Sequence, residues 1–451
     1  MAKRSLFSVL AVTTLLAGVS GYVVADIKDV APGYFTEKAP VVGESAPEIP
    51  QGQFDTILPR EIRQDLQPLK KSDLQPVWDE LNNSTQGKWG AGAYVIDAVT
   101  GNVVFAQNEM KPVVPASTTK VFAAFVALDA LDPQDTLETR IYLEGNTLHL
   151  VGEGDLLLGA DEGDPQKVSG RAGLGDLARQ AVAKVGTGPQ RLVIHQKLHD
   201  GPLVDPRIEK DLLNWISPQG SVAINAGYGQ GGNNQAPIQL VGDTLAEHFA
   251  SLGAPVEVSY SDDPYQGDKP VAQVSSASIL EITRLMLERS DNTLAEHLCR
   301  LAAQKQTGNS SPESASANLM RRISELPIPT EGFSVTACSG LTEANRISPQ
   351  TTAEFFYYLW RLGTPQQKQI LRMNPVSAYS GTLANRMTDS VAAGRVQAKS
   401  GLLDSAAALA GVAVTKSGRP LIFHVQTTEV PEGAAATRLD LDKFMEALVN
   451  R

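Results

Sequence analysis

Alternating apolar and polar stretches divide most of the chain into short strands and amphipathic helices. Apolar runs over Trp89–Asp97 and Val103–Gln107, joined by turn residues at Thr100–Asn102, predict a β-hairpin. The stretch 117–131 is rich in Ala, Phe, Val and Leu and lacks Gly and Pro, which predicts a mostly buried helix that begins at Ser117. The pattern thus changes from strand to helix at this serine.

The second half of the chain is mainly helical before it returns to strands. Three amphipathic segments predict helices, at 278–287, 292–303 and 351–362. Two apolar strands joined by a turn and a final helix follow, at Ala406–Thr415, Pro420–Thr427 and 434–448. This order predicts an α+β domain in which the first and last strands share one antiparallel sheet.

A change of composition marks a smaller domain within this body. Between residues 141 and 260, Gly-rich loops alternate with short strands, Thr147–Val151 and Arg191–Ile194, around a helix at 174–185. The sequence LAEH occurs at Leu245 and again at Leu294, and it marks two amphipathic helices rather than a repeat. We therefore expect an inserted domain at 141–260, and a catalytic domain formed by 76–140 and 261–451.

The N-terminal segment predicts export. Lys3 and Arg4 precede an uncharged stretch, Ser5–Ala25, which suits either a cleaved signal peptide or an uncleaved membrane anchor over residues 1–25. Residues 26–75 are rich in proline and form an expected linker. We expect a protein of the extracytoplasmic envelope, secreted or anchored, that meets the membrane only through this segment.

Composition narrows the classes of partner. The 451 residues carry 39 Lys and Arg against 50 Asp and Glu, a net charge of −11, which argues against binding nucleic acid or an anionic membrane surface. Two cysteines, six histidines and the absence of H-E-x-x-H favour neither a metal site nor a disulfide framework. We expect no metal and no cofactor.

Three short motifs carry the candidate chemistry: Ser117-Thr118-Thr119-Lys120, Ser290-Asp291-Asn292 and Lys399-Ser400-Gly401. Each is weak alone, and the chain holds second copies of two of them, Ser316-Ala317-Asn318 and Lys416-Ser417-Gly418. Context separates the copies, because Lys416 lies in a turn between two strands whereas Lys399 lies within a strand or at its bend. Ser290 separates two helices, where a tight loop can direct its side chains.

The combination suits nucleophilic catalysis by serine. A serine hydroxyl needs a base within hydrogen-bond reach, and Lys120 lies three residues after Ser117 on nearly the same helix face. Burial and a second cation, Lys399, would lower the pKa of Lys120 toward neutrality.

Five stretches in order resemble the bacterial serine D-alanyl-D-alanine carboxypeptidases and endopeptidases, the class C low-molecular-mass penicillin-binding proteins. They are PASTTK at 115–120, SDNTLAEHL at 290–298, SGLTEANRISP at 339–349, GTLANRM at 381–387 and QAKSGLL at 397–403. The resemblance covers most of the body after residue 84. It implies the α+β transpeptidase-like fold of serine β-lactamases and penicillin-binding proteins, with an inserted smaller domain.

The resemblance also implies roles for the motif residues. Ser117 is the expected nucleophile and Lys120 its base, while Ser290 and Lys399 relay the proton to the leaving amine. The expected substrate-binding residues are Asn292, Ser400, Gly401, Leu402 and Asp155, and the backbone N–H groups of Ser117 and Leu402 form the oxyanion hole. The expected partners are peptidoglycan stem peptides, with β-lactams as covalent inhibitors.

Several assignments stay open in the sequence. Asp155 either faces the cationic amine of the stem peptide or bonds its own backbone in a turn, because the family's GxGDP pattern is only partly kept at 152–156. Cys299 and Cys338 either form a disulfide or are buried thiols. Gly381, Thr382 and Arg386 either line the cleft or form a structural loop.

Alternative functions are a β-lactamase, or a non-catalytic wall-binding protein of the same fold. No acidic residue can be assigned as a deacylation base, which disfavours the first, and a binding module needs no intact set of catalytic groups, which disfavours the second. A Ser-His-Asp hydrolase is disfavoured because no G-x-S-x-G motif occurs.

Overall fold

A central antiparallel sheet joins the two ends of the folded body. The computed structural model describes residues 71–84, 90–229, 232–430 and 434–451, together with Ile57. Five strands lie in the order β12-β13-β14-β1-β2. Their bounds are β1 Gly90–Asp97, β2 Val103–Gln107, β12 Val396–Leu402, β13 Ala406–Val414 and β14 Pro420–Thr428. Because β1 pairs antiparallel with β14, from Gly90 opposite Thr428 to Asp97 opposite Leu421, the prediction of a shared sheet is confirmed.

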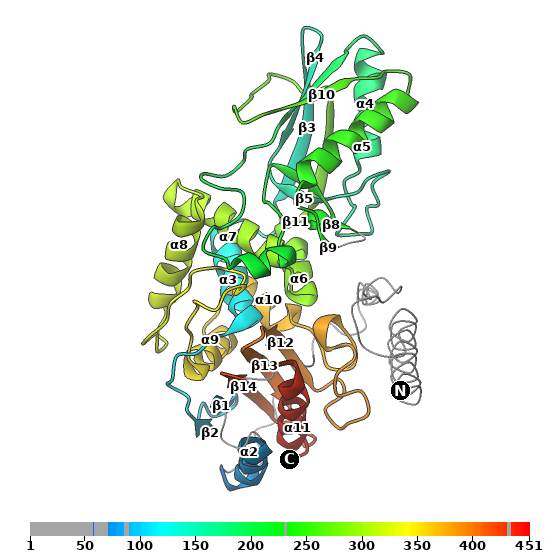
Figure 1. The fold of residues 1–451 in the computed structure, drawn as a ribbon. Helices are drawn as coiled ribbons and strands as arrows, with labels where there is room; N and C mark the ends of the chain where they lie inside the picture. Colours follow the sequence, from blue (N-terminus) through cyan, green and yellow to red (C-terminus); the bar gives the residue numbers. More distant parts are fainter. Residues whose placement is uncertain (1–56, 58–70, 85–89, 230–231, 431–433) are drawn as a thin grey trace, which may run out of the picture. The chain divides into compact units, whose positions relative to one another are not determined.

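Helices cover both faces of this sheet (Figure 1). Successive strand residues point to opposite faces, so Tyr94 and Ile96 pack with α3 and α9 while Ala93 and Val95 pack with α2 and α11. The helices of this domain are α2 Lys71–Ser84, α3 Lys120–Ala130, α6 Ile279–Arg289, α7 Asn292–Thr307, α8 Pro312–Ser324, α9 Pro349–Arg361, α10 Pro365–Met373 and α11 Arg438–Val449. Short 3-10 helices are η1 Ala116–Thr119, η4 Gly381–Leu383 and η5 Ala434–Thr437.

A second five-stranded sheet, in the order β10-β6-β4-β3-β11, forms the inserted region. Its apolar residues build a separate core with α4 and α5. The bounds are β3 Thr136–Glu144, β4 Thr147–Gly152, β6 Arg191–His195, β10 Glu257–Ser261, β11 Ala272–Ser278, α4 Leu174–Val185 and α5 Pro237–Ser251. Smaller elements are β5 Asp155–Leu158, β7 Val222–Ile224, β8 Tyr228–Gly229, β9 Gly232–Asn233, η2 Lys210–Trp215 and η3 Asn225–Gly227.

Two of the expected boundaries differ from the structure. The second sheet extends past the expected limits of 141–260, because β3 starts at Thr136 and pairs with β11, which runs to Ser278. The polar composition of β11 hides this strand from an apolar pattern. The expected linker 26–75 overlaps α2, whose Leu74 and Trp78 are buried one helical turn apart in the core.

The N-terminal segment and most of the linker, residues 1–56 and 58–70, lie outside the described residues. Within the part of the chain that the structure describes, no helix is both long enough and apolar enough to cross a membrane.

Candidate active site

Ser117 lies on η1, directly before the buried helix α3. The hydroxyls of Thr118 and Thr119 donate to the carbonyls of Pro115 and Ala116, at 2.7 and 2.9 Å, and so fix the turn before the helix. Ala116 has φ +48°, a left-handed conformation that is strained for a residue with a Cβ. Local hydrogen bonds therefore hold Ser117 in place at the start of α3.

Lys120 brings two motifs together. Its Nζ donates to Ser117 Oγ at 2.9 Å, to Asn292 Oδ1 at 2.6 Å and to the carbonyl of Ser339 at 2.7 Å. The side chain is completely buried, and burial lowers its pKa to about 7, against the opposing charges of Asp291 and Glu296. An amine with such a pKa is neutral in a large fraction of molecules near pH 7 and can accept the serine proton.

The Ser290-Asp291-Asn292 motif forms the junction between α6 and α7. Ser290 ends α6 in a left-handed conformation, φ +58°, and the Asp291 carboxylate caps α7 by accepting from the N–H of Leu294 at 2.9 Å. Asn292 Nδ2 donates to the carbonyl of Trp215 at 2.8 Å. This tight junction directs Ser290 and Asn292 toward the two lysines.

Lys399 lies on β12, the edge strand of the central sheet. Its Nζ donates to Ser290 Oγ at 2.8 Å, and to the carbonyl of Ser400 at 2.8 Å. The side chain is fully buried, and burial together with the charge of Lys120 lowers its pKa well below the ordinary value. Ser290 and Lys399 therefore form a second serine–lysine pair.

The end of β12 lies beside Ser117. A Cβ added to Gly401 would come within 2.8 Å of the Pro115 carbonyl and 3.2 Å of the Ser117 nitrogen, so only glycine permits this approach. Leu402, the next residue, ends the strand and is 42% exposed. The expected oxyanion donors, the N–H groups of Ser117 and Leu402, thus belong to segments that lie side by side.

One of the three open cleft residues lies at this site. Thr382 Oγ1 is 2.6 Å from Ser400 Oγ. Arg386 instead forms a buried ion pair with Asp442 of α11, which is a structural contact. Gly381 has φ +50°, and a Cβ there would lie 2.5 Å from the Glu288 carbonyl, so this residue shapes the loop that holds Thr382.

Of the two roles expected for Asp155, the structure shows the hydrogen bond to its own backbone segment. It is 1% exposed in β5, and its Oδ1 accepts from the N–H of Leu157 at 2.8 Å. Burial raises its pKa to about 7. The preceding Gly154 carbonyl accepts from Nε2 of His297, on α7, at 2.9 Å. The structure thus places Asp155 at the junction of the inserted region with α7, hydrogen-bonded to its own strand.

The second motif copies and the cysteines lie outside the catalytic arrangement. Ser316 is on α8 near Arg207, and Lys416 is exposed in the turn between β13 and β14. Cys299 and Cys338 are free, fully buried thiols, and burial raises the pKa of both.

Three contributors to the site went unnoticed in the sequence: the backbone carbonyls of Ser339 and Trp215, and the buried carboxyl group of Glu296. Backbone carbonyls leave no signal in residue type. Glu296 does have one, because it follows Asn292 by four residues and so shares its helix face.

No group of three or more His, Cys, Asp or Glu side chains is placed to hold a metal ion among the described residues. The arrangement can perform acyl transfer to serine with lysines as proton carriers.

Comparison with known proteins identifies the family of this chain. The model of the D-Ala-D-Ala carboxypeptidase 3 (S13) family matches residues 79–231 and 220–448. Carboxypeptidase DacB of Mycolicibacterium smegmatis is 30% identical over 359 residues, which cover 76% of this chain and 77% of the relative. A D-alanyl-D-alanine carboxypeptidase of an Actinomadura species is 23% identical over 416 residues, covering 71% and 74%.

Solved structures show the same fold. Penicillin binding protein 4 from Haemophilus influenzae superposes with a TM-score of 0.68 at 17% identity, over 82% of this chain and 98% of that one. A predatory peptidoglycan endopeptidase from Bdellovibrio bacteriovorus gives a TM-score of 0.51 at 15% identity, over 80% and 92%. The expected α+β fold of penicillin-binding proteins is confirmed.

Proposed function

Because the chain belongs to the D-Ala-D-Ala carboxypeptidase 3 (S13) family and is a serine-type hydrolase of D-Ala-D-Ala termini, we propose that Ser117 and Lys120 carry its acylation step. The observation that supports this most directly is the 2.9 Å contact between Lys120 Nζ and Ser117 Oγ, with the amine fully buried. Neutral Lys120 takes the proton as Ser117 Oγ attacks the penultimate D-Ala carbonyl. The substrate is a peptidoglycan stem peptide.

The oxyanion of the tetrahedral intermediate lies between the N–H groups of Ser117 and Leu402. Such donors bind more strongly as negative charge develops on the carbonyl oxygen. The close approach of Gly401 to the Ser117 nitrogen supports this arrangement. Asn292, fixed through Lys120 and Trp215, hydrogen-bonds the backbone of the bound peptide.

Ser290 and Lys399 deliver the proton to the leaving D-Ala amine. The 2.8 Å bond between them forms a route that ends at the Ser290 hydroxyl, next to the acyl group. Breakage of the C–N bond releases D-alanine and leaves an ester on Ser117, which water then hydrolyses. Lys399 and Ser400 also bind the terminal carboxylate of the substrate, which in turn raises the pKa of Lys399.

Acylation by β-lactams follows from the same chemistry, since the lactam carbonyl occupies the position of the scissile peptide. A penicillin-binding protein 4 structure complexed with a β-lactam supports this proposal by analogy of fold. The β-lactamase alternative requires rapid hydrolysis of the ester, and therefore a base that activates water. The group that donates a hydrogen bond to Ser117 Oγ is the Lys120 amine, not a carboxyl group. The assembled set of five catalytic and binding groups disfavours a non-catalytic wall-binding protein.

Labelling with a fluorescent penicillin tests the assignment of the nucleophile. Ser117→Ala is expected to abolish covalent labelling, whereas Ser316→Ala, in the second S-x-N copy, is expected to label like the wild type. Equal labelling of wild type and Ser117→Ala would contradict the proposal. Release of D-alanine from a pentapeptide measures carboxypeptidase action, and cleavage of cross-linked dimers measures endopeptidase action.

We also propose that the protein works outside the cytoplasm, where its substrate lies. Lys3 and Arg4 followed by the uncharged stretch 5–25 support export. Cell fractionation, with N-terminal sequencing of the mature protein, distinguishes a cleaved signal peptide from a retained anchor. Recovery of the protein in the cytoplasmic fraction alone would contradict export.

A further inference from the structure

The direction of the Lys120 lone pair depends on two acceptors. A neutral amine has two N–H groups and one lone pair, so it can donate to only two of its three partners while it accepts from the third. When the N–H groups point to Asn292 Oδ1, at 2.6 Å, and to the Ser339 carbonyl, at 2.7 Å, the lone pair faces Ser117 Oγ. The position of the Ser339 carbonyl therefore governs how well Lys120 accepts the serine proton.

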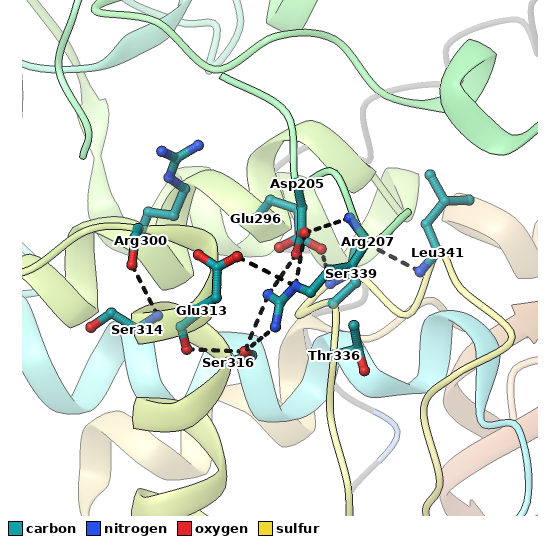
Figure 2. A network of polar contacts seen from close by, with 12 residues as sticks. Asp205, Arg207, Glu296, Arg300, Glu313, Ser314, Ser316, Thr336, Ser339 and Leu341 are labelled. Atoms are coloured by element: carbon teal, nitrogen blue, oxygen red, sulfur yellow. Dashed lines mark hydrogen bonds and ion pairs between the residues drawn. The ribbon is translucent and has the colours of Figure 1, made fainter. Parts of the chain in front are cut away.

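Ser339 is held at its amide by a buried carboxyl group. Its N–H donates to Glu296 Oε1 at 2.7 Å, and its Oγ accepts from the N–H of Leu341 at 3.2 Å, as Figure 2 shows. Gly340 has φ +76°, and a Cβ there would lie 2.0 Å from the Ala116 carbonyl. The segment around Ser339 thus packs closely against the turn that precedes Ser117, and the hydrogen bond to Glu296 holds its backbone in place.

Glu296 is placed to act together with Asn292. It is 3% exposed and lies four residues after Asn292 on α7, so both side chains project from the same helix face toward α3. One helix thereby supplies one acceptor of Lys120 directly, through Asn292, and anchors the residue that supplies the other, Ser339.

The charged and titratable groups around Glu296 come from several elements. They are Lys120 of α3, Arg300 of α7 itself, Asp205 and Arg207 of the loop before η2, and the thiols of Cys299 and Cys338. Burial raises the pKa of Glu296, while hydrogen bonds from Ser339 oppose the rise. The charge of Glu296 in turn raises the pKa of Lys120, against the larger effect of burial.

We propose that Glu296 is a positioning residue for the carboxypeptidase reaction: by holding the Ser339 amide, it keeps the Ser339 carbonyl on Lys120 and the Lys120 lone pair on Ser117. The inference rests on the proposed function, because it requires Lys120 as the base. Glu296 itself touches neither Ser117 nor the expected position of the substrate. Its effect is therefore on proton transfer rather than on substrate binding.

The test measures the rate of acylation by a fluorescent penicillin between pH 5 and 9 in full-length variants. Glu296→Gln retains a carbonyl acceptor for the Ser339 N–H but loses the charge. Its acylation rate at high pH is expected to stay within about 10-fold of the wild-type rate. The acidic limb of its pH–rate profile is expected to shift to lower pH, because the pKa of Lys120 falls when the charge is lost. Glu296→Ala loses the acceptor, and its rate is expected to fall about 10²-fold, as for a misplaced catalytic group.

Glu313→Gln is the matched control, because Glu313 is an exposed member of the same network that lies 3.9 Å from Arg207. Glu313→Gln is expected to keep the wild-type acylation rate and the wild-type midpoint of the pH–rate profile. A folded Glu296→Ala that acylates at the wild-type rate would overturn the inference. If Glu296→Ala fails to fold, Glu296→Gln decides: an unshifted acidic limb, or a shift equal to that of Glu313→Gln, overturns it.

Lys120→Ala separates this inference from the function on which it rests. Labelling of Lys120→Ala at the wild-type rate would refute the proposed function itself. Loss of labelling in Lys120→Ala, together with wild-type kinetics in both Glu296 variants, would refute the positioning role alone.

Discussion

Lys399 Nζ lies 2.8 Å from Ser290 Oγ, although 109 residues separate the two in the chain. Lys399 is carried by the edge strand β12, and Ser290 by the left-handed residue that ends α6. Both side chains have polar partners in a site where a buried unpaired lysine would be costly. The contact therefore joins the sheet to the helical part of the catalytic domain.

Removal of Lys399 is expected to stop the release of D-alanine while a control lysine does not. In Lys399→Ala the proposed proton relay and the proposed carboxylate contact are both lost, so kcat/KM for a pentapeptide should fall about 10²- to 10⁴-fold. Lys416→Ala changes the lysine of the second K-S-G copy, in an exposed turn, and should keep the wild-type value. A comparable loss of kcat/KM in Lys399→Ala and Lys416→Ala would contradict the assignment of Lys399, rather than Lys416, to the active site.

Acylation is expected to depend on pH with a midpoint near the pKa of Lys120, about 7. In the proposed mechanism the neutral amine is the base, and the protonated form dominates below the pKa, so the rate should fall on acidification by about tenfold per pH unit below the midpoint. Penicillin acylation rates from pH 5 to 9 measure this, with a melting curve at each pH as the control for unfolding. A rate that stays constant down to pH 5 would contradict a lysine base.

The same buried amine should make stability depend on pH. Its pKa is about 7 in the folded protein and about 10.4 when unfolded, so the unfolded chain binds more protons between these values. The free energy of unfolding should therefore rise with pH, with up to about 1.4 kcal/mol per pH unit from Lys120. Denaturant unfolding at pH 7, 8 and 9 measures the free energy of unfolding at each pH. This free energy should rise less steeply with pH for Lys120→Met than for the wild type or Lys416→Met. Parallel slopes for all three proteins would be incompatible with a buried, neutral Lys120.

Gly401→Ala is expected to impair the oxyanion hole without unfolding the protein. The added Cβ would lie 2.8 Å from the Pro115 carbonyl, so β12 must move away from Ser117. Loss of one oxyanion donor costs about 10²- to 10³-fold in rate, which acylation kinetics would measure. Gly188→Ala, where a Cβ meets no atom within 4 Å, is the matched control. Equal acylation rates for Gly401→Ala and Gly188→Ala would show that the close approach of Gly401 does not matter for the oxyanion hole.

Thr382 and Ser400 are expected to bind the substrate as a pair. Their hydroxyl oxygens are 2.6 Å apart, so Thr382 can donate to Ser400 while Ser400 donates to the substrate carboxylate. Thr382→Val should raise KM for a pentapeptide by about 2- to 10-fold, the contribution of one hydrogen bond. If the pair acts together, the double variant with Ser400→Ala should be no worse than Ser400→Ala alone. Additive effects would mean that the two hydroxyls act independently.

Local sequence determined the helices and strands that carry the motifs. The apolar run after Ser117 favours a helix, and the Ser290–Asn292 turn follows from a left-handed C-cap and an Asp N-cap. The order of strands and helices likewise implied the shared sheet. The family motifs indicated which serines and lysines to consider, because their spacing reflects the local geometry.

Tertiary structure decided what those residues meet. The burial that lowers the pKa of Lys120, the partnership of Thr382 with Ser400 and the buried ion pair of Arg386 with Asp442 all depend on segments far apart in the chain. Backbone carbonyls such as that of Ser339 have no residue-type signature at all. Sequence periodicity fixes which face of an element a residue occupies, but the desolvation and hydrogen bonding that make a lysine a base arise only when α3, α7 and β12 pack together.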